Sequence, residues 1–294
     1  MKVKDSFGDR VFNAIIYVVL TILMLIVLYP LWLVVINSFS DANAVSLGQV
    51  TIIPVGFNLD AYKETFQYDN VISGYLNSLY YTVVGTVISL LLTIPVAYTL
   101  SKQNLKGRGF LMMVFTFVMY FSGGLIPEYI MIRNLGLMNT RAVVLLVGGL
   151  SVYNMIVARS FFESGVPREL EEAAEIDGCN QLQTFIRIVL PLSKAMLGVI
   201  TLYYAVARWN SFTPSLYYQP MAPQFHSLQM VLRDLIIRAQ NAVTMQGEDA
   251  IYYAELLNKI KYSVIVVASV PMLVIFPFVQ KYFDKGVMLG SVKG

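Results

Sequence analysis

Long uncharged runs alternate with short charged segments along most of the chain. Five runs contain no aspartate, glutamate, lysine or arginine. Each is close to or longer than the roughly 20 apolar residues that cross a bilayer as a helix. The pattern predicts five membrane-spanning helices, at residues 11–40, 70–101, 109–127, 142–158 and 262–280.

A sixth and weaker candidate covers residues 188–207. Lys194 interrupts it, so that only residues 195–207 are free of charge, but a lysine near one end of a span can extend to the membrane surface. We therefore predict six spans. The first run is too long for a signal peptide and lacks a cleavage site, so it is interpreted as a retained helix, bent near Pro30.

The composition agrees with a membrane protein that crosses the bilayer several times. Hydrophobic residues make up 57% of the 294 residues and charged residues 13%, with a mean hydropathy of +0.64. Soluble domains carry about 25% charged residues. The net charge of +3 is small and does not indicate a nucleic-acid partner.

The lysines and arginines predict which side of the membrane each segment faces. If the N-terminus is inside, 13 of the 21 lie in cytoplasmic segments. Cytoplasmic loops carry an excess of these residues. The expected topology therefore has both ends in the cytoplasm, and it places there the segment 164–191, which we name the acidic loop.

The acidic loop combines helix signals with an unusual density of carboxylates. Pro167 suits the first turn of a helix, where its missing N–H is not needed. Five carboxylates follow within residues 169–177, beginning at the end where the helix dipole favours negative charge. Gly178 is placed to end this helix in a left-handed cap.

The rest of the acidic loop predicts a compact helical corner. Leu170, Ala173, Ala174 and Ile176 provide a small apolar surface on the first helix. A second short helix is expected over residues 180–189, running into Pro191. Such an acidic corner between two spans indicates contact with something outside the bilayer.

The same residues carry a resemblance to a known family. Glu172-Ala173-Ala174, Asp177-Gly178 and, nine residues later, Ile188-x-Leu190-Pro191 resemble the EAA loop of ABC importer permeases at every position of the motif. The plain alternative is an ordinary amphipathic helix hairpin on a membrane protein. Spacing, order and membrane context together favour the EAA loop.

Other segments resemble the maltose-type sugar permeases in particular. These are Asn77-Ser78-Leu79, Ala97-Tyr98, Gly107-Arg108 and the tail from Gly286 to Lys293-Gly294. Arg208-Trp209-Asn210-Ser211 with Leu216-Tyr217-Tyr218 is similar to a branch for complex oligosaccharides. Cys179 departs from the family, which more often has alanine there, but it leaves the glycine corner intact.

The resemblance implies an all-α permease with six transmembrane helices, part of a type I ABC importer in a bacterial plasma membrane. It divides the chain into residues 1–74, a permease core 75–280 and a cytoplasmic tail 281–294.

The expected partners are a second permease, two ATPase subunits and a solute-binding protein. The acidic loop is expected to contact the ATPase through Glu172, Ala173, Ala174, Asp177 and Gly178. ATP and Mg²⁺ belong to the partner ATPase, and no cofactor is expected in this chain.

Aromatic and amide side chains around the candidate span 188–207 and the loop after it suit a sugar, because sugars combine apolar faces with hydroxyl groups. Aromatic residues are also enriched at membrane interfaces, so the same residues suit a purely structural role. In the maltose-type family the sugar can also contact mainly the partner permease. The candidates for the substrate path are Tyr203, Tyr204, Trp209, Asn210, Tyr217 and Tyr218.

The proline-broken segment from residue 209 to about 261 is too polar for a span. Two interpretations remain open: a loop that dips toward the translocation path, or a plain external loop. Its second half, residues 229–261, is expected to be an amphipathic interfacial helix.

Other chemistry is scarce in the sequence. The chain has one histidine, one cysteine and no phosphate-binding GxxxxGK[ST] loop, so bound ATP requires another chain. The uncharged spans also lack the carboxylates of ion-coupled carriers. The alternatives left open are an ABC permease for a non-sugar solute such as a peptide, and an ion-coupled carrier or membrane enzyme.

Overall fold

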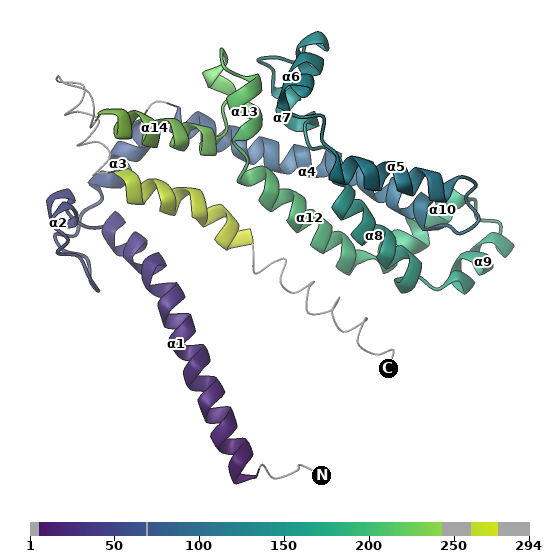
Figure 1. The fold of residues 1–294 in the computed structure, drawn as a ribbon, viewed down its shortest axis with the longest axis horizontal. Coiled ribbons are helices and arrows are strands. Elements are labelled where there is room, and N and C mark those ends of the chain that lie inside the picture. The colour runs from purple at the N-terminus through teal and green to yellow at the C-terminus, as the bar shows by residue number, and fades with distance from the viewer. Residues whose placement is uncertain (1–5, 69, 243–259, 276–294) are drawn as a thin grey trace. The chain divides into compact units, whose positions relative to one another are not determined.

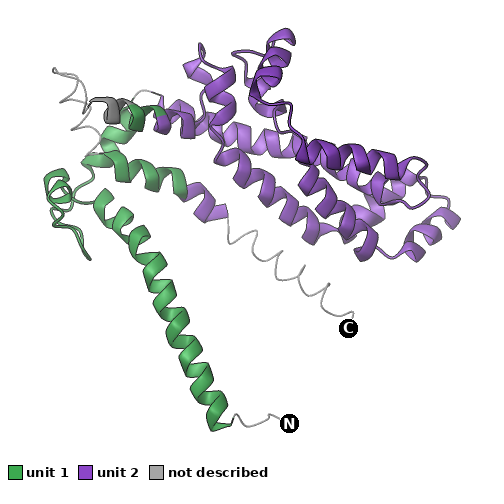
Figure 2. Cartoon of the chain, viewed as in Figure 1, with its two compact units in different colours: residues 1–69, 234–269 green, residues 70–233, 270–294 purple. Residues whose placement is uncertain are grey.

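The computed structural model describes residues 6–68, 70–242 and 260–275, and every regular element in these ranges is a helix. The predicted all-helical class is thus confirmed. The chain divides into two compact units, coloured in Figure 2: residues 1–69 and 234–269 form unit 1, and residues 70–233 and 270–294 form unit 2. The division after residues 74 and 280 stays a prediction.

Unit 1 contains three complete helices and parts of two others among its described residues. The complete helices are α1 (Phe7–Ser38), α2 (Ala42–Ser46) and α3 (Asp60–Gln67). The parts are α14 (Leu228–Ala242) from residue 234 onward and the helix Ile260–Ile275 as far as residue 269. α1 begins where the Asp9 carboxylate accepts a hydrogen bond from the Ser6 backbone N–H at 2.9 Å, and it continues through Pro30. α3 and the helix Ile260–Ile275 meet at a buried hydrogen bond of 2.6 Å between the Thr65 and Ser263 hydroxyls.

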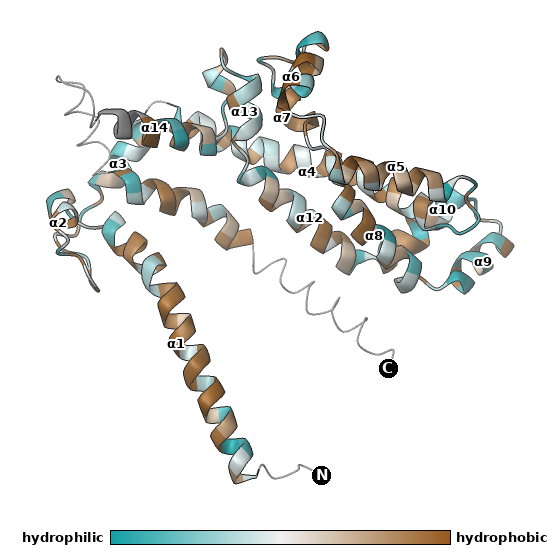
Figure 3. Cartoon of the chain, in the orientation of Figure 1, coloured by the Kyte–Doolittle hydropathy of each residue, from teal (hydrophilic) through white to brown (hydrophobic). Residues whose placement is uncertain are grey.

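α1 is apolar along most of its length, as the brown ribbon in Figure 3 shows. None of the residues in its most hydrophobic stretch is buried within the chain. Soluble proteins rarely expose so large an apolar surface. The exposed side chains of α1 therefore suit lipid or helices of another subunit.

The core of unit 2 lies between α4 (Val71–Ser101), α8 (Val152–Gly165) and α12 (Lys194–Trp209) (Figure 1). Ala97, Met155, Ala158 and Ile200 are fully buried where these helices meet. Small residues such as the two alanines let helix backbones approach closely in a membrane protein.

Shorter helices surround this core. They are α5 (Arg108–Tyr120), α6 (Leu125–Asn134), α7 (Arg141–Leu146), α9 (Arg168–Ile176), α10 (Gln181–Thr184), η1 (Phe185–Val189), α11 (Leu190–Leu192), α13 (Thr213–Tyr218), η2 (Pro223–Phe225) and α14 (Leu228–Ala242).

Two of the predicted spans are broken at a glycine, and a third, 188–207, bends by 83° before α12. The run 109–127 forms α5 and the start of α6, which meet at an angle of 110°. The run 142–158 is divided between α7 and α8. Gly124 and Gly148 lie in the two breaks with positive φ angles of 86° and 68°, a conformation that glycine adopts without strain. Each run therefore contains a helix break that the hydrophobic pattern does not reveal, because that pattern carries no information on backbone angles.

The described residues contain two to four helices or bent helix pairs that could cross a bilayer. Among the described residues, α1 and α4 are each long and apolar enough to cross a bilayer. Counting the bent pair α5–α6 and the bent pair 181–192 with α12 brings the number to four. The predicted run 262–280 is described only to Ile275. Of the predicted interfacial helix 229–261, residues 229–242 lie in α14, while residues 243–259 and the predicted tail 281–294 lie outside the described residues.

Candidate functional site

The acidic loop forms a corner that is closed by its own backbone. α9 ends at Ile176 with Asp177 as its C-cap, and Gly178 follows with a φ of +81°. The Cys179 N–H donates to the Ala174 carbonyl at 2.9 Å and the Gly178 N–H to the Glu175 carbonyl at 3.1 Å. This pair of bonds is the Schellman arrangement, which satisfies carbonyls that the end of a helix leaves free. The predicted glycine cap is confirmed. Pro167 lies at the N-cap, one position before the predicted first turn.

The second helix of the acidic loop starts at a capping box. Asn180 and Gln183 each accept a hydrogen bond from the other's backbone N–H, both at 2.9 Å. The helix then passes through a π-helical turn, η1, before Pro191. Pro191 lacks the N–H that a regular helix would donate to the Arg187 carbonyl, and a π turn accommodates such an interruption. A bend of 83° after this helix leads into α12.

The outward surface of the acidic loop is both charged and apolar. Glu172, Ala173, Asp177 and Gly178 are exposed, whereas Ala174 is 4% exposed and faces the protein. Four large apolar side chains on the loop also face outward, at Leu170, Ile176, Leu182 and Ile186. Ile176 is 87% exposed, so the surface is open to a partner.

One carboxylate of α9, Glu171, faces the protein instead. It pairs with Lys102 at the end of α4 and accepts a hydrogen bond from the Tyr98 hydroxyl at 3.2 Å. The Tyr98 ring stacks on Phe185 at 4.7 Å and contacts the edge of Phe162 at 5.6 Å. The Lys102–Glu171 pair and the Tyr98–Glu171 hydrogen bond are both partly buried, and each aromatic pair contributes about 0.5–1.5 kcal/mol beyond burial. The polar contacts of Glu171 and the aromatic contacts of Tyr98 together attach the loop to α4 and α8.

Sequence reasoning did not find this attachment. Tyr98 entered only through the family resemblance, and Glu171 was one carboxylate among five. The available signal was the position of a tyrosine and a lysine, Tyr98 and Lys102, one helical turn apart at the end of a span.

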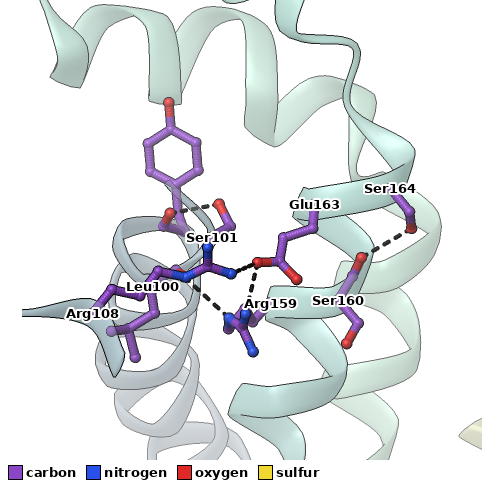
Figure 4. Close-up of polar contacts among 8 residues, drawn as sticks. Leu100, Ser101, Arg108, Arg159, Ser160, Glu163 and Ser164 are labelled. Atoms are coloured by element: carbon purple, nitrogen blue, oxygen red, sulfur yellow. Dashed lines mark hydrogen bonds and ion pairs between the residues drawn. The ribbon is translucent and has the colours of Figure 1, made fainter. Parts of the chain in front are cut away.

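A second polar cluster joins the same ends of α4, α5 and α8 (Figure 4). Glu163 pairs with both Arg108 and Arg159, the latter at 2.7 Å. The Arg159 Nε also donates to the Leu100 carbonyl at 3.0 Å. These contacts fix the helix ends that carry the acidic loop.

A cavity of about 670 Å³ lies within unit 2, beside α12. Its polar lining includes phenol and hydroxyl groups, with one charged side chain, Arg208. Tyr203 and Tyr204 both border it. Tyr203 is 40% exposed, whereas Tyr204 is 3% exposed. The Tyr204 hydroxyl lies 2.6 Å from the Thr93 hydroxyl and accepts from the Ser151 N–H at 2.9 Å.

The other substrate-path candidates do not line this cavity. Trp209 is 2% exposed and its ring meets Tyr75 edge-on at 5.8 Å. Asn210 caps the end of α12, where its amide donates to the Val206 carbonyl at 3.0 Å.

The last two candidates lie on α13. Tyr217 is partly exposed. Tyr218 is buried, and burial, aided by the Glu128 carboxylate, raises the pKa of its phenol to about 12. Its ring packs beside that of Tyr129, with centroids 6.3 Å apart.

The polar segment after α12 folds back onto α4. The Asn77 amide donates to the carbonyls of Gln224 and His226, at 2.9 and 3.0 Å. The Ser78 hydroxyl accepts from the Leu228 N–H at 2.8 Å. Asn77 and Ser78, which the sequence identified only by resemblance, therefore position this segment.

The described residues hold no group of three or more histidine, cysteine, aspartate or glutamate side chains that could bind a metal ion. The family model for the binding-protein-dependent transport system inner membrane component matches residues 71–289. The chain belongs to this family. It is thus a permease component of a binding-protein-dependent ABC transporter.

Related proteins agree on carbohydrates. The polygalacturonan/rhamnogalacturonan transport system permease protein YtcP of Bacillus subtilis is 37% identical over 97% of this chain and 99% of its own length. The galactooligosaccharides transport system permease protein GanQ of Bacillus subtilis is 29% identical over 95% and 94%. A crystal structure of a bacterial ABC transporter involved in the import of the acidic polysaccharide alginate matches with a TM-score of 0.85 and 32% identity, over 96% of this permease and all of that chain.

The permease is therefore a membrane subunit of a carbohydrate or oligosaccharide ABC importer, in the plasma membrane. It is a transport subunit rather than an enzyme, and its family works with an ATPase and a solute-binding protein. This finding excludes the alternatives of an ion-coupled carrier and a membrane enzyme, and it favours carbohydrate over another solute.

Proposed function

We propose that the permease forms half of the translocation path together with a second, different permease. Two ATPase subunits bind on the cytoplasmic side and the solute-binding protein binds on the other. The exposed apolar surface of α1 supports this assembly, because α1 has little contact within its own unit and suits a partner helix or lipid.

The acidic loop is the ATPase contact in this proposal. The observation that carries it is the exposed surface of Glu172, Ala173, Asp177 and Gly178, held on a corner that is capped at both helices. Such a corner keeps its shape when the ATPase pushes on it. When the ATPase dimer closes on ATP, its movement is therefore passed to the membrane helices as rigid-body motion. The Tyr98 contacts pass that motion directly to α4.

The cavity beside α12 is this chain's part of the path. Its phenols and hydroxyls suit the hydroxyl groups and apolar faces of a sugar, and Tyr203 is the aromatic candidate with the most open ring. Tyr204, Trp209 and Tyr218 support the wall through buried contacts, and Asn210 and Tyr217 are its exposed neighbours.

An oligosaccharide is the substrate in this proposal. The names of similar proteins specify polygalacturonan/rhamnogalacturonan, galactooligosaccharides and the acidic polysaccharide alginate. Reconstitution tests it: proteoliposomes with this permease and its partners are expected to take up oligosaccharide in an ATP-dependent manner. Omission of the solute-binding protein is expected to remove the stimulation of ATP hydrolysis, and stimulation without it would contradict the assembly.

The proposed topology has six spans with both ends in the cytoplasm. In a chain whose native cysteine is replaced by Cys179→Ala, single cysteines at Ser6 and Ser291 are expected to react only from the cytoplasmic side. A cysteine at Ser46 is expected to react from outside. Labelling of the Ser291 position from outside would contradict an even number of spans.

A further inference from the structure

Arg208 is the charged side chain that borders the cavity in unit 2. It lies in the last turn of α12. Its guanidinium donates to the carbonyls of Val144 and Leu145, at 2.9 and 3.0 Å, and to the Ser89 hydroxyl at 3.0 Å. All three acceptors are neutral.

The positive charge of Arg208 has no carboxylate partner in the part of the chain that the structure describes. None of the four ion pairs found there involves Arg208, and no aspartate or glutamate lines the cavity. The guanidinium stays charged in proteins. The three hydrogen bonds offset much of the cost of burying the guanidinium. They come from neutral acceptors, so the positive charge that borders the cavity keeps no counter-charge among the described residues.

The guanidinium is also held in a defined place with hydrogen-bonding capacity left over. Three of its five N–H groups have acceptors, one on Nη1 and two on Nη2. The Nε–H is buried against α4, so the second N–H of Nη1 is the group left for a ligand. The side chain lies flat against α4 at Gly85, where an added Cβ would come within 2.6 Å of the Arg208 Cδ and Nε atoms. Glycine at position 85 thus makes the space that this arginine occupies.

We propose that Arg208 binds a carboxylate of the translocated sugar, so that the importer carries acidic, uronate-containing oligosaccharides. This inference rests on the proposed path through the cavity. The phenols and hydroxyls of the lining suit the sugar rings, and the guanidinium supplies the charge complement of a carboxylate. A neutral sugar would leave the arginine without an ionic partner at every step.

The test uses the complete importer in proteoliposomes and two matched probes. The first probe is a mixture of short galacturonate and mannuronate oligomers, and the second is the same mixture with its carboxylates methyl-esterified. The readout is the ratio of acid to ester uptake. Wild type is expected to prefer the acid. Arg208→Gln is expected to lower the ratio about tenfold or more, because a charge-assisted hydrogen bond contributes about 1.5–3 kcal/mol.

A second pair of variants guards against misfolding of Arg208→Gln. The Ser151 hydroxyl accepts from the Asn154 N–H at 3.3 Å at the start of α8 and borders the same cavity. Aspartate and asparagine are equally good caps there, so Ser151→Asp and Ser151→Asn differ mainly in charge. The ratio of acid to ester uptake is expected to be about tenfold lower in Ser151→Asp than in Ser151→Asn. The new aspartate repels the carboxylate of the sugar, or it pairs with the Arg208 guanidinium and occupies the carboxylate site.

Equal ratios in the Ser151 pair, or wild-type uptake of the ester without the acid, would overturn the inference and leave the proposed function intact. ATP-dependent uptake of neither mixture would overturn the inference and count against the proposed oligosaccharide path as well.

Discussion

The two ends of α12 are built in opposite ways. Before it, the corner of the acidic loop is closed by hydrogen bonds between close neighbours in sequence, such as Cys179 to Ala174 and Gln183 to Asn180. After it, the cavity wall and the segment that follows include bonds across 53 to 150 positions of the chain, such as Ser151 to Tyr204 and Leu228 to Ser78. The first end presents side chains to a partner, and the second end packs them inward.

The difference shows how each end serves transport. A corner that is closed by its own residues keeps its shape when it is exposed, which suits a contact with another subunit. A wall built from distant segments changes shape when those segments move, which suits a path that must open and close. Variants at the two ends are therefore expected to fail in different ways.

The largest effect is expected at Gly178. Gly178→Val places a β-branched residue at a positive φ, which costs about 1–2 kcal/mol for an ordinary residue and more for a β-branched one. No atom lies within 4 Å of the added Cβ, so the effect acts through the backbone rather than by a clash. Transport and ATPase stimulation are expected to be lost while membrane insertion is kept.

Gly178→Asn is the control, because asparagine tolerates the left-handed conformation. It is expected to retain most transport, measured as uptake and as copurification of the ATPase. If Gly178→Val shows wild-type uptake and wild-type copurification of the ATPase, the acidic loop is not the element that couples the ATPase to transport.

At the C-terminal end of α12, a substitution of Trp209 tests whether this region depends on inward packing. Trp209→Ala removes a buried ring that contacts Tyr75, and such truncations cost about 3–5 kcal/mol. The thermal unfolding temperature of the complex is expected to fall, and Trp209→Phe is expected to recover most of the loss. Asn210→Ala is the matched surface variant. If Asn210→Ala lowers uptake at an unchanged unfolding temperature, the segment contacts solute directly.

Within the acidic loop, Glu172 and its neighbour Glu171 are expected to differ, because Glu172 faces outward and Glu171 faces the protein. Glu172 is exposed, and we expect it to pair with a basic residue of the ATPase at about 1.5–3 kcal/mol. Glu172→Lys is expected to separate the ATPase from the complex, and Glu172→Gln to weaken the contact less. Glu171→Gln instead affects the internal contacts with Lys102 and Tyr98. Unchanged ATPase copurification with both Glu172 variants would place the contact elsewhere.

The same contrast explains what the sequence could predict. The acidic loop was predictable in detail because proline, glycine and capping residues act on their immediate neighbours, as Gly178 shows. The cavity was not, because Tyr203 and Arg208 reach it only through the packing of α4, α7 and α12. Arg208 was identified by resemblance alone, without its charge being considered. The breaks at Gly124 and Gly148 were missed because hydropathy counts side chains and not backbone angles.

Site-directed crosslinking from the acidic loop tests the central claim most directly. In a Cys179→Ala chain, a single cysteine replaces Glu172 and carries a photoreactive probe in the assembled importer. The account predicts a crosslink to the ATPase subunit that changes in yield when ATP is bound, and that disappears when Gly178→Val is added. A probe that reacts only with lipid or with this chain itself, while the ATPase remains bound, would contradict it.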